Sequence, residues 1–533
     1  MSTILPHGAF LAPPSDLAKA WRASLFHHLD GLALTVLVPL LEERGILAAF
    51  DGDAVHDVDS LAGAFGANAG YLNVLCRLCA SQGWLERSTR QDKVYYRRSG
   101  KEGWSDWRKG VASAKVGRYW LEVAEGMWNH PEIPWNSNEE DAMKACMQSM
   151  DQAPPLWRNH LEGALLAPWL VTLGTVHGTE AFVDWNGLSA ALARLHPSRA
   201  KAAMKALKQG DLLGTEKGGF FLSRAAAYGV TTSYIRTFLW AEELLFGDGG
   251  TLWRTEPGEA EIHVDRKLNV WGSGGAHGAY FRHLDEVVRK VFDAPLESQP
   301  KGLCDMGCGN GALLLHLEGF IRTQTLRGQH LDAYPLVLVG ADFNQAALDA
   351  TEAHFLQEGV NGHFLWGDIG DPDRLDRDLQ GRHGFALCDL LNVRSFLDHN
   401  RVFNRPVERR TVRARTTGAY AFRGERLRAK DVEQSLKEHF LKWRPHVARH
   451  GLLVIELHTM SPSDAAQRHG RMPATAYDAT HGFSDQYIVE VPVYDAMAEE
   501  AGLIKDGSVS RTFPRALPAT VSLRYFIGAC PGP

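Results

Sequence analysis

The sequence predicts an α/β protein, with a doubly wound, Rossmann-like parallel sheet in the second half of the chain and an α-rich first half. The glycine-rich stretch 303–312, LCDMGCGNGA, has apolar residues on both sides, the pattern of a strand that turns sharply into a helix. Apolar runs that end in acidic or polar residues follow it at 336–342, 364–368, 385–389 and 451–458. Such continuous apolar runs are typical of parallel strands that are buried on both faces.

The glycine-rich turn predicts a cofactor site. Asp305 precedes Gly307, Gly309 and Gly311, which permit positive φ and let a ligand lie against bare backbone. Positions 312 and 314 are not glycine, so the dinucleotide pattern G-x-G-x-x-G is absent. An acid ahead of G-x-G-x-G instead resembles motif I of class I S-adenosylmethionine (SAM) methyltransferases. This resemblance implies that the glycine backbone packs against the methionine part of SAM and that Asp305 orients it.

The later strands extend the predicted cofactor site. Asp342 ends the second strand, where an acid typically binds ribose hydroxyls at the carboxyl edge of a doubly wound sheet. Asp368 ends the third strand, where the related family places an adenine-binding acid, and 385–389 is expected to be the fourth strand. Tyr280, in a Gly- and aromatic-rich segment before the sheet, is expected to pack against SAM. The predicted cofactor residues are Asp305, Gly307, Gly309, Gly311, Asp342, Phe343, Asp368, Ile369, Asp389 and Tyr280.

Composition narrows the class of protein. The chain has 533 residues, of which 45% are hydrophobic and 23% are charged, as in a soluble globular protein. A formal net charge of −6 argues against a nucleic-acid partner. The sequence shows neither a signal peptide nor an apolar run long enough to span a membrane, so a cytoplasmic protein is expected. The seven cysteines form no metal-binding set, since Cys76 and Cys79 have no second pair.

The first half predicts two winged-helix-like units that form a lid. A helix at 69–82 is followed by two strand-like pieces near 84–98, and a helix at 198–209 is followed by two more at 211–216 and 219–223. The predicted domains are a helical and winged-helix-like unit at 1–110, a helical lid or linker at 111–170, a second winged-helix-like unit at 171–258 and the methyltransferase domain at 259–533.

A winged helix also suggests DNA binding, but the charges disfavour it. The helix at 69–82 carries one base, Arg77, while the helix at 198–209 carries Arg199, Lys201, Lys205 and Lys208. Because the whole chain is acidic, a lid or a homodimer contact is preferred to a DNA contact. A SAM-sensing, DNA-binding regulator stays open as an alternative.

Polar residues beyond the fourth strand predict a catalytic region. Asn392 and Arg394 are expected at the carboxyl end of the sheet as catalytic residues. Residues 401–430 then hold nine arginines and two glutamates. This run is compatible with a solvated loop, or with a site that docks a phosphorylated, acidic partner such as an acyl carrier protein or coenzyme A.

Histidines after the fifth strand suggest either a metal site or a general base. His458 ends the run 451–458, and His481 and Gln486 follow in THGFSDQ. Imidazole with an oxygen donor suits Fe or Mn, so His458, His481 and Gln486 are candidate metal ligands. In the alternative, one histidine is the catalytic base and the other is structural.

Several stretches of the second half resemble one family: HVDRKLNVWGSGGAH, LCDMGCGNG, NVRSFLDHNR, TGAYAFRGERL, HFLKWRPHVARHGLLVIELHT and ATHGFSDQYIVEV. They are similar to the C-methyltransferases of the apratoxin polyketide synthase loading module and the related saxitoxin synthase. The resemblance implies methylation at the α-carbon of an acyl thioester, in some members assisted by iron or manganese. Here the metal-side residues would be His458, His481 and Gln486. No carrier-protein serine motif follows, so a free-standing enzyme is expected.

The predicted reaction follows from the weakness of carbon as a nucleophile. A cation stabilises the enolate that forms when a histidine removes the α-proton. The alternative within the same class, an O- or N-methyltransferase acting on a small molecule, needs a base but no metal.

Overall fold

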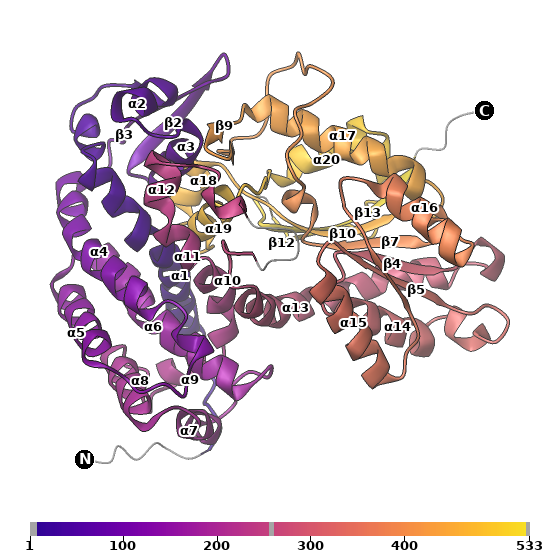
Figure 1. The fold of residues 1–533 in the computed structure, drawn as a ribbon, viewed down its shortest axis with the longest axis horizontal. Helices are drawn as coiled ribbons and strands as arrows, with labels where there is room; N and C mark the ends of the chain where they lie inside the picture. Colours follow the sequence, from indigo (N-terminus) through magenta and orange to yellow (C-terminus); the bar gives the residue numbers. More distant parts are fainter. Residues whose placement is uncertain (1–7, 255–260, 517, 529–533) are drawn as a thin grey trace. The chain divides into compact units, whose positions relative to one another are not determined.

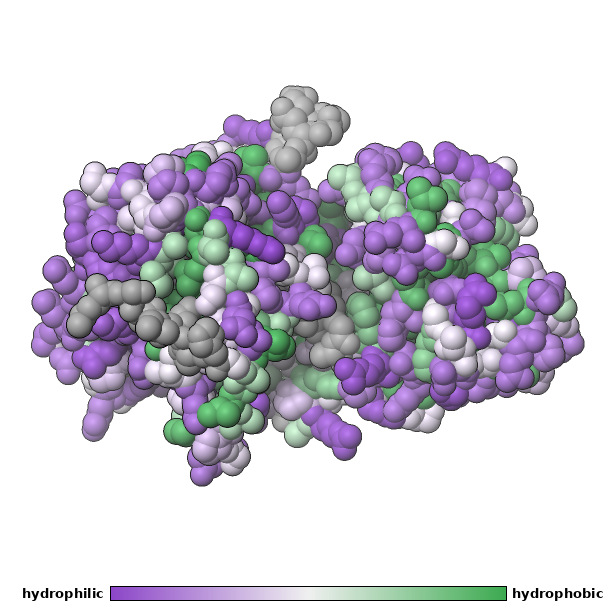
Figure 2. Space-filling model, turned by 90° about the horizontal axis from the view of Figure 1, so that it is seen from below, coloured by the Kyte–Doolittle hydropathy of each residue, from purple (hydrophilic) through white to green (hydrophobic). Residues whose placement is uncertain are grey.

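The computed structural model describes residues 8–254, 261–516 and 518–528. The chain divides into two compact units, and it passes between them several times. The helical unit comprises Met1–His277, Ala419–Leu427 and Ser461–Asp485, and the sheet unit comprises Gly278–Gly418, Arg428–Met460 and Gln486–Pro533. On the face shown in Figure 2, hydrophilic residues cover most of the surface, because most apolar side chains are buried in two cores.

The helical unit is built mainly from antiparallel helices around α1 (Ser15–Glu43) and α6 (Pro155–His177). Its other helices are α2 (Val58–Phe65), α3 (Ala69–Ser81), α4 (Trp104–Ala124), α5 (Ser137–Gln152), α7 (Trp185–Ala193), α8 (Pro197–Gln209), α9 (Glu216–Leu222), α10 (Gly229–Ser233), α11 (Ile235–Leu239), α12 (Ala241–Phe246), α18 (Pro462–Gln467) and α19 (Ala474–Gly482). Helix α13 (Arg266–Phe292) runs from this unit into the next. The residues at 104–170 are therefore mostly helical, as predicted.

The α1 helix is long and apolar enough to cross a membrane by length and composition alone. However, 83% of its most apolar window is buried inside the protein, as in the central helix of a folded core. Helix α6 packs along it, and Gly31 and Gly163 allow the two backbones to approach closely. A Cβ atom at Gly31 would lie 2.5 Å from the Cα of His160, and one at Gly163 would lie 2.4 Å from the Cα of His28. The chain thus uses its most apolar segment as an internal support.

The first winged-helix-like unit has the predicted elements. Helices α2 and α3 precede β2 (Leu85–Arg90) and β3 (Lys93–Arg98), and β1 (His56–Asp57) joins the same sheet in the order β1-β3-β2. Nearly every residue of α3 is buried, and Arg77 is ion-paired with Asp478 of the α19 helix. A DNA-recognition helix needs an exposed face, so α3 cannot act as one in this packing.

The second predicted strand–turn–strand ribbon is wrong. Residues 216–222 form α9, and 211–215 form a turn with no strand, so the stretch from α9 to the end of α12 at Phe246 is helical. The side chain of Thr215 caps α9 by accepting a hydrogen bond from the backbone N–H of Gly218 at 3.0 Å. Phe220, Phe221 and Leu222 are all buried by this helix, which explains why the apolar run resembles a strand.

The sheet unit contains eight paired strands among the described residues, in the order β11-β13-β10-β7-β4-β5-β6 with β12 paired to β13. The strands are β4 (Gly302–Met306), β5 (Val337–Asp342), β6 (His363–Trp366), β7 (Leu391–Ser395), β10 (Leu452–Leu457), β11 (Leu503–Lys505), β12 (Arg511–Phe513) and β13 (Val521–Gly528). Strands β6, β5, β4, β7 and β10 are parallel to their neighbours, and β13 is antiparallel to β10. The direction of strand succession reverses between β4 and β7, where a doubly wound sheet binds its ligand.

Helices cover both faces of this sheet (Figure 1), which is why its central strands are continuous apolar runs. One face carries α14 (Ala312–Gln324) and α15 (Gln345–Glu358), and the other carries α16 (Pro372–His383), α17 (Ala429–Val447) and α20 (Val491–Glu500). A short hairpin of β8 (Ala421–Phe422) and β9 (Glu425–Arg426) belongs to the helical unit. The predicted Rossmann-like α/β fold is confirmed.

The fourth strand differs from the prediction. It is β7 at 391–395, and the predicted strand 385–389 lies outside it as a loop and a short 3-10 turn. The polar residues Asn392 and Arg394 lie inside β7, where the sequence pattern suggests a loop. Both are buried and hydrogen-bonded, so the strand tolerates them in the core.

Candidate active site

The glycine turn lies between β4 and α14 at the carboxyl edge of the sheet. Gly307, Gly309 and Gly311 have φ values of 81°, 58° and 76°, which are left-handed conformations that favour glycine. A Cβ at Gly309 would meet no atom within 4 Å, while one at Gly307 would lie 2.9 Å from the side chain of Leu397. The backbone at Gly309 therefore faces open space, as a cofactor cradle requires.

Asp305 is the residue before the last of β4, directly behind this turn, and it is 1% exposed. Its Oδ1 atom is buried and has no hydrogen-bond partner among the described residues. Burial, together with the nearby charge of Asp342, raises the pKa of Asp305 well above its ordinary value. A buried carboxylate oxygen without a partner is costly, so it marks a place where a bound cationic or hydrogen-bonding ligand would be stabilised. The turn and Asp305 together fit SAM.

Asp342 ends β5 at the same edge and holds the glycine turn in place. Its carboxylate accepts hydrogen bonds from the backbone N–H of Gly309 at 3.1 Å and of Asn344 at 2.9 Å. The next residue, Phe343, is 66% exposed, and its ring lies 5.3 Å from that of Trp366 at the end of β6. An exposed aromatic ring beside two acid-ended strands suits a contact with the adenine of SAM.

Asp368 and Ile369 follow β6 at this edge as well. Asp368 accepts a hydrogen bond from the N–H of Gly370 at 2.7 Å, and Ile369 is buried below it. The carbonyl of Ile369 accepts a hydrogen bond from Trp443 at 2.8 Å, which fixes this loop to α17. Both residues stay in the predicted cofactor set.

Asp389 is misplaced in the prediction. It precedes β7, so it lies at the amino edge of the sheet, opposite the glycine turn. There it forms ion pairs with Lys301 and Arg449, both at 3.0 Å. Its carboxylate is used to join the beginnings of neighbouring strands, and a role in SAM binding is withdrawn.

Tyr280, on α13, lies between two other aromatic rings of the sheet unit. Its ring is 6.0 Å from Phe396 and 5.0 Å from Phe513. Phe396 directly follows β7 with a φ of 54°, a left-handed conformation that is uncommon for a bulky residue. Tyr280 thus reaches the carboxyl edge of the sheet, and its contact with SAM stays a prediction.

A pocket at this edge lies beside the ends of β7 and β10. It is a small hollow that is partly open to solvent. Its walls come from the loop after β7, the end of β10, the segment before α20, and the helices α17 and α20; they are formed by Asp398, His399, Arg401, Leu436, Glu456, Leu457, Tyr487, Val489 and Tyr494.

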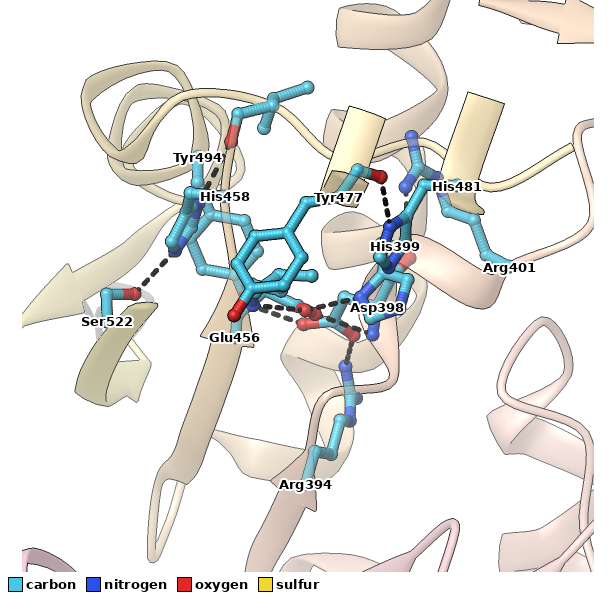
Figure 3. Close-up of polar contacts among 12 residues, drawn as sticks. Arg394, Asp398, His399, Arg401, Glu456, His458, Tyr477, His481, Tyr494 and Ser522 are labelled. Carbon is cyan, nitrogen blue, oxygen red and sulfur yellow. Dashed lines mark hydrogen bonds and ion pairs between the residues drawn. The ribbon is translucent and has the colours of Figure 1, made fainter. Parts of the chain in front are cut away.

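His399 and Glu456 form a buried pair in this pocket (Figure 3). The Nδ1 atom of His399 lies 2.5 Å from Oε1 of Glu456, and the two side chains are 6% and 2% exposed. A carboxylate accepts hydrogen bonds, so Nδ1 of His399 carries a proton and donates it to Glu456. This is the arrangement of a histidine base that is oriented by an acid.

Asp398 fixes the pair from behind. Its backbone N–H donates to Oε2 of Glu456 at 2.8 Å, and its carboxylate accepts hydrogen bonds from Arg394 and Tyr494 at 2.5 Å and from His439 at 3.0 Å. Burial alone would raise the pKa of Asp398, but the Arg394 charge and the bonds from His439 and Tyr494 hold it well below its ordinary value. Asp398 is therefore a fixed negative charge.

Asn392 and Arg394, the two residues of β7 that were predicted to be catalytic, have structural roles. The amide of Asn392 donates to three backbone carbonyls near the amino end of the strand, the closest being that of Leu387 at 3.1 Å. Arg394 is fully buried and lies 3.9 Å above the ring of Trp443, where it pairs with Asp398. Neither side chain lines the pocket, so Arg394 acts on it through Asp398 and Asn392 does not reach it.

His458, the first of the predicted metal ligands, is already hydrogen-bonded at both ring nitrogens. Both ring nitrogens of His458 are engaged, Nδ1 with the carbonyl of Val489 at 3.0 Å and Nε2 with the hydroxyl of Ser522 at 2.7 Å (Figure 3). Burial lowers the pKa of His458 to about 3, so the ring is a neutral structural group. His458 therefore does not fit the role of ligand or of base.

The other two predicted ligands belong to different units of the chain. His481 belongs to the helical unit, where its Nδ1 bonds to the carbonyl of Tyr477 at 2.6 Å, and Gln486 begins the last segment of the sheet unit. No group of three or more His, Cys, Asp or Glu side chains in the described parts of the chain is arranged to hold a metal ion.

The fold and this site define the class. A doubly wound sheet with its glycine turn at the switch point, a buried acid behind the turn and further acids after β5 and β6 is the arrangement of a class I SAM-dependent methyltransferase. Residues 261–524 match the family described as the AprA MT2-like domain, 21–87 the AprA N-terminal domain and 162–248 the AprA winged helix domain. The chain belongs to this AprA methyltransferase family, with the N-terminal domain first, the winged helix domain second and the MT2-like domain last along the sequence.

Solved structures to which this chain is similar include the CurJ carbon methyltransferase, with 11% identity and a TM-score of 0.39 over 97% of this chain and 93% of that one. Another is the DszA carbon methyltransferase, with 10% identity and a TM-score of 0.36 over 99% of this chain and all of that one. The mitomycin 7-O-methyltransferase MmcR is similar at 14% identity and a TM-score of 0.28, covering 96% of each chain. At these sequence identities and TM-scores, the similarities do not indicate which reaction this chain catalyses. No curated protein matches the chain.

The sequence contained a signal for the pocket pair that the prediction did not use. Glu456 is the acid near the end of the fifth strand, and His399 follows the fourth. Strands β7 and β10 are parallel neighbours, so residues beyond their carboxyl ends meet. The pattern of an acid on one strand end and a histidine beyond the adjacent strand end was the available signal.

Proposed function

We propose that the chain is a SAM-dependent C-methyltransferase that methylates the α-carbon of an acyl thioester. The observation that carries the proposal is the His399–Glu456 pair, which lies with Arg401 in a pocket at the same sheet edge as the glycine turn. A base beside a buried cation is what removal of a proton from carbon needs. The family supplies the expectation of a carrier-bound or coenzyme A-bound acyl group.

The chain's own residues perform the proton transfer. His399 Nε2 accepts the α-proton, and the imidazolium that results is stabilised by the carboxylate of Glu456, 2.5 Å from Nδ1. SAM, when bound through the glycine turn and Asp305, supplies an electrophilic methyl group. The pocket residues exclude water from the acceptor carbon while it carries negative charge.

Arg401 supplies the positive charge for the enolate oxygen. Its guanidinium is 3% exposed and lies 5.6 Å from the centre of the Tyr487 ring. It donates to the backbone carbonyls of Asp398 at 3.0 Å and of Val432 at 3.3 Å, which hold it in the pocket wall. A fixed cation that faces a developing oxyanion stabilises the transition state more than the ground state.

The test is intact-mass analysis of acetoacetyl-coenzyme A and of an acetoacetyl-loaded acyl carrier protein after incubation with SAM. We expect a gain of one methylene by the wild-type enzyme and a loss of about 10²–10⁴-fold in rate for His399→Asn. The matched control is His446→Asn, since His446 is also a buried histidine beside a carboxylate, 2.8 Å from Asp373 of α16, and it does not line the pocket. The control variant should keep its rate.

Methylation of hydroxyl or amine acceptors with no change in either thioester would replace this proposal by the O- or N-methyltransferase alternative. Equal rates for His399→Asn and wild type would remove His399 as the base. SAM binding without transfer to any acceptor, together with specific DNA binding, would favour the regulator.

A further inference from the structure

Residues 402–415 form an exposed segment of the sheet unit that starts directly beside the pocket. Arg401 lines the pocket, and the next residue, Val402, is 67% exposed. Farther along, Val407 is 94% exposed and Val412 is 54% exposed. The segment has neither helix nor strand, yet it places three apolar side chains in solvent. Isolated exposed apolar residues are ordinary, so the meaning of these depends on the shape and charge around them.

Buried and half-buried acids hold the backbone of this segment. The carboxylate of Glu438 accepts the N–H groups of Val407 at 3.1 Å and Glu408 at 3.0 Å. Glu433, which is fully buried, accepts the N–H groups of Arg415 at 2.5 Å and Thr416 at 2.8 Å. Backbone donors tied to carboxylates at two places give the segment a fixed course, so its outer side chains form a defined surface.

The arginines of the segment divide into two kinds. Arg410 is buried and pairs with Glu500 at 2.8 Å and with Glu433 at 3.1 Å. Arg409 and Arg413 are exposed, and neither takes part in an ion pair or hydrogen bond within the described part of the chain. Residues 402–415 hold five arginines and one glutamate, which gives +4 in a chain whose net charge is −6. Because Arg410 and Arg415 pair with glutamates of the same unit, the exposed positive charge available to a partner is that of Arg409 and Arg413.

We propose that Val407, Val412, Arg409 and Arg413 form a docking surface for the acidic face of the protein that carries the acyl group. The proposal rests on the proposed function and adds to it the place of contact. Unpaired arginines around exposed valines suit an acidic surface with a small apolar patch, and such charge complementarity increases the rate of encounter. A surface of this size fits a weak, transient contact, which a carrier needs because it must leave after each transfer.

The experiment compares Arg409→Glu/Arg413→Glu with wild type on two substrates. We expect kcat/KM for an acetoacetyl-loaded acidic acyl carrier protein to fall about 10–100-fold, with kcat/KM for acetoacetyl-coenzyme A within about twofold of wild type. Lys201→Glu/Lys208→Glu, which makes the same charge change on exposed residues of α8, should leave both values unchanged. Val407→Ser should weaken only the reaction with the carrier.

A binding measurement separates this proposal from the proposed reaction. Titration of the unloaded carrier protein into the enzyme needs no chemistry, and the Kd should rise about tenfold in the double arginine variant and rise with added salt in the wild type. Equal Kd values for the variant and wild type would overturn the docking surface even if methyl transfer occurs. Equal losses on the carrier and on coenzyme A, or loss of nucleic-acid binding in place of carrier binding, would also overturn it.

Discussion

Replacing Glu456 by Gln removes the negative charge behind His399 while keeping the shape of the side chain. In the wild type, Oε1 lies 2.5 Å from His399 Nδ1 and accepts the N–H of Leu457 at 2.7 Å, while Oε2 accepts the N–H of Asp398 at 2.8 Å. A glutamine has one acceptor oxygen for these three donors. Its NH₂ group therefore points either at a backbone N–H, where two donors meet, or at Nδ1 of His399, where it favours the tautomer with the proton on Nε2. We expect kcat to fall about 10²–10⁴-fold, which corresponds to about 3–5 kcal/mol of lost transition-state stabilisation.

The same substitution also affects folding. Leaving one buried N–H without its acceptor costs about 1–3 kcal/mol in the free energy of unfolding, so rates should be measured well below the melting temperature of the variant. Single-turnover methyl transfer is the appropriate assay because it isolates the chemical step from product release. The affinity for SAM, measured by calorimetry, should not change, since Glu456 lies outside the predicted cofactor set.

Glu318→Gln is the matched control. Glu318 is a buried carboxylate of α14 that accepts from Arg322 at 2.6 Å, and it does not line the pocket. The control should lose stability and keep its rate. A folded Glu456→Gln enzyme with kcat within about threefold of wild type, a change of less than about 1 kcal/mol, would refute the role of Glu456 in stabilising the imidazolium.

The cofactor cradle and the histidines of the helical unit give two further predictions. Gly309→Ala should raise the Kd for SAM at least tenfold, because the new methyl enters the open space above a residue with φ 58°; left-handed alanine also costs about 1–2 kcal/mol of stability. Gly319→Ala, on α14 and also in open space, should leave the Kd unchanged, and equal Kd values for both variants would argue against the cradle. His160 is fully buried, and burial lowers its pKa to about 3, so its contribution to stability is complete above about pH 6.5 and is lost as pH falls toward 3. At about 1.4 kcal/mol per pH unit, urea unfolding should show that this group loses roughly 2–3 kcal/mol of the free energy of unfolding between pH 6.5 and 4.5. His160→Asn should make the free energy of unfolding depend less steeply on pH. An unchanged pH dependence would mean that the ring of His160 is protonated in the folded protein.

Some elements of the fold could be predicted from the local sequence pattern alone. The glycine turn and the strand that ends at Asp342 were predictable because buried parallel strands are apolar and their ends carry acids. The fourth strand was not, since Arg394 is neutralised only by Asp398 and stacks on Trp443, a residue 49 positions away along the chain. Local composition cannot report a partner at that distance.

The candidate site also depends on partners that are distant along the chain. His458 resembles a ligand in the sequence, but its surroundings include the carbonyl of Val489 and the hydroxyl of Ser522, which use both ring nitrogens. His399 and Glu456 are separated by 57 residues, and only the pairing of β7 with β10 brings them together. The order of strands therefore decides which histidine can act as a base.

The division of the chain into units has a practical consequence for anyone who wishes to produce the methyltransferase part alone. The fragment that starts after the winged helix domain carries Ser461–Asp485 with it, although Ala476, Ala479 and Phe483 of this segment are buried in the core of the helical unit. Cut away from that core, the apolar face of α19 would be left in water, within a few residues of Tyr487 in the pocket wall. The segments of the helical unit and the sheet unit thus alternate along the sequence. The two units therefore cannot be exchanged between relatives by a single crossover.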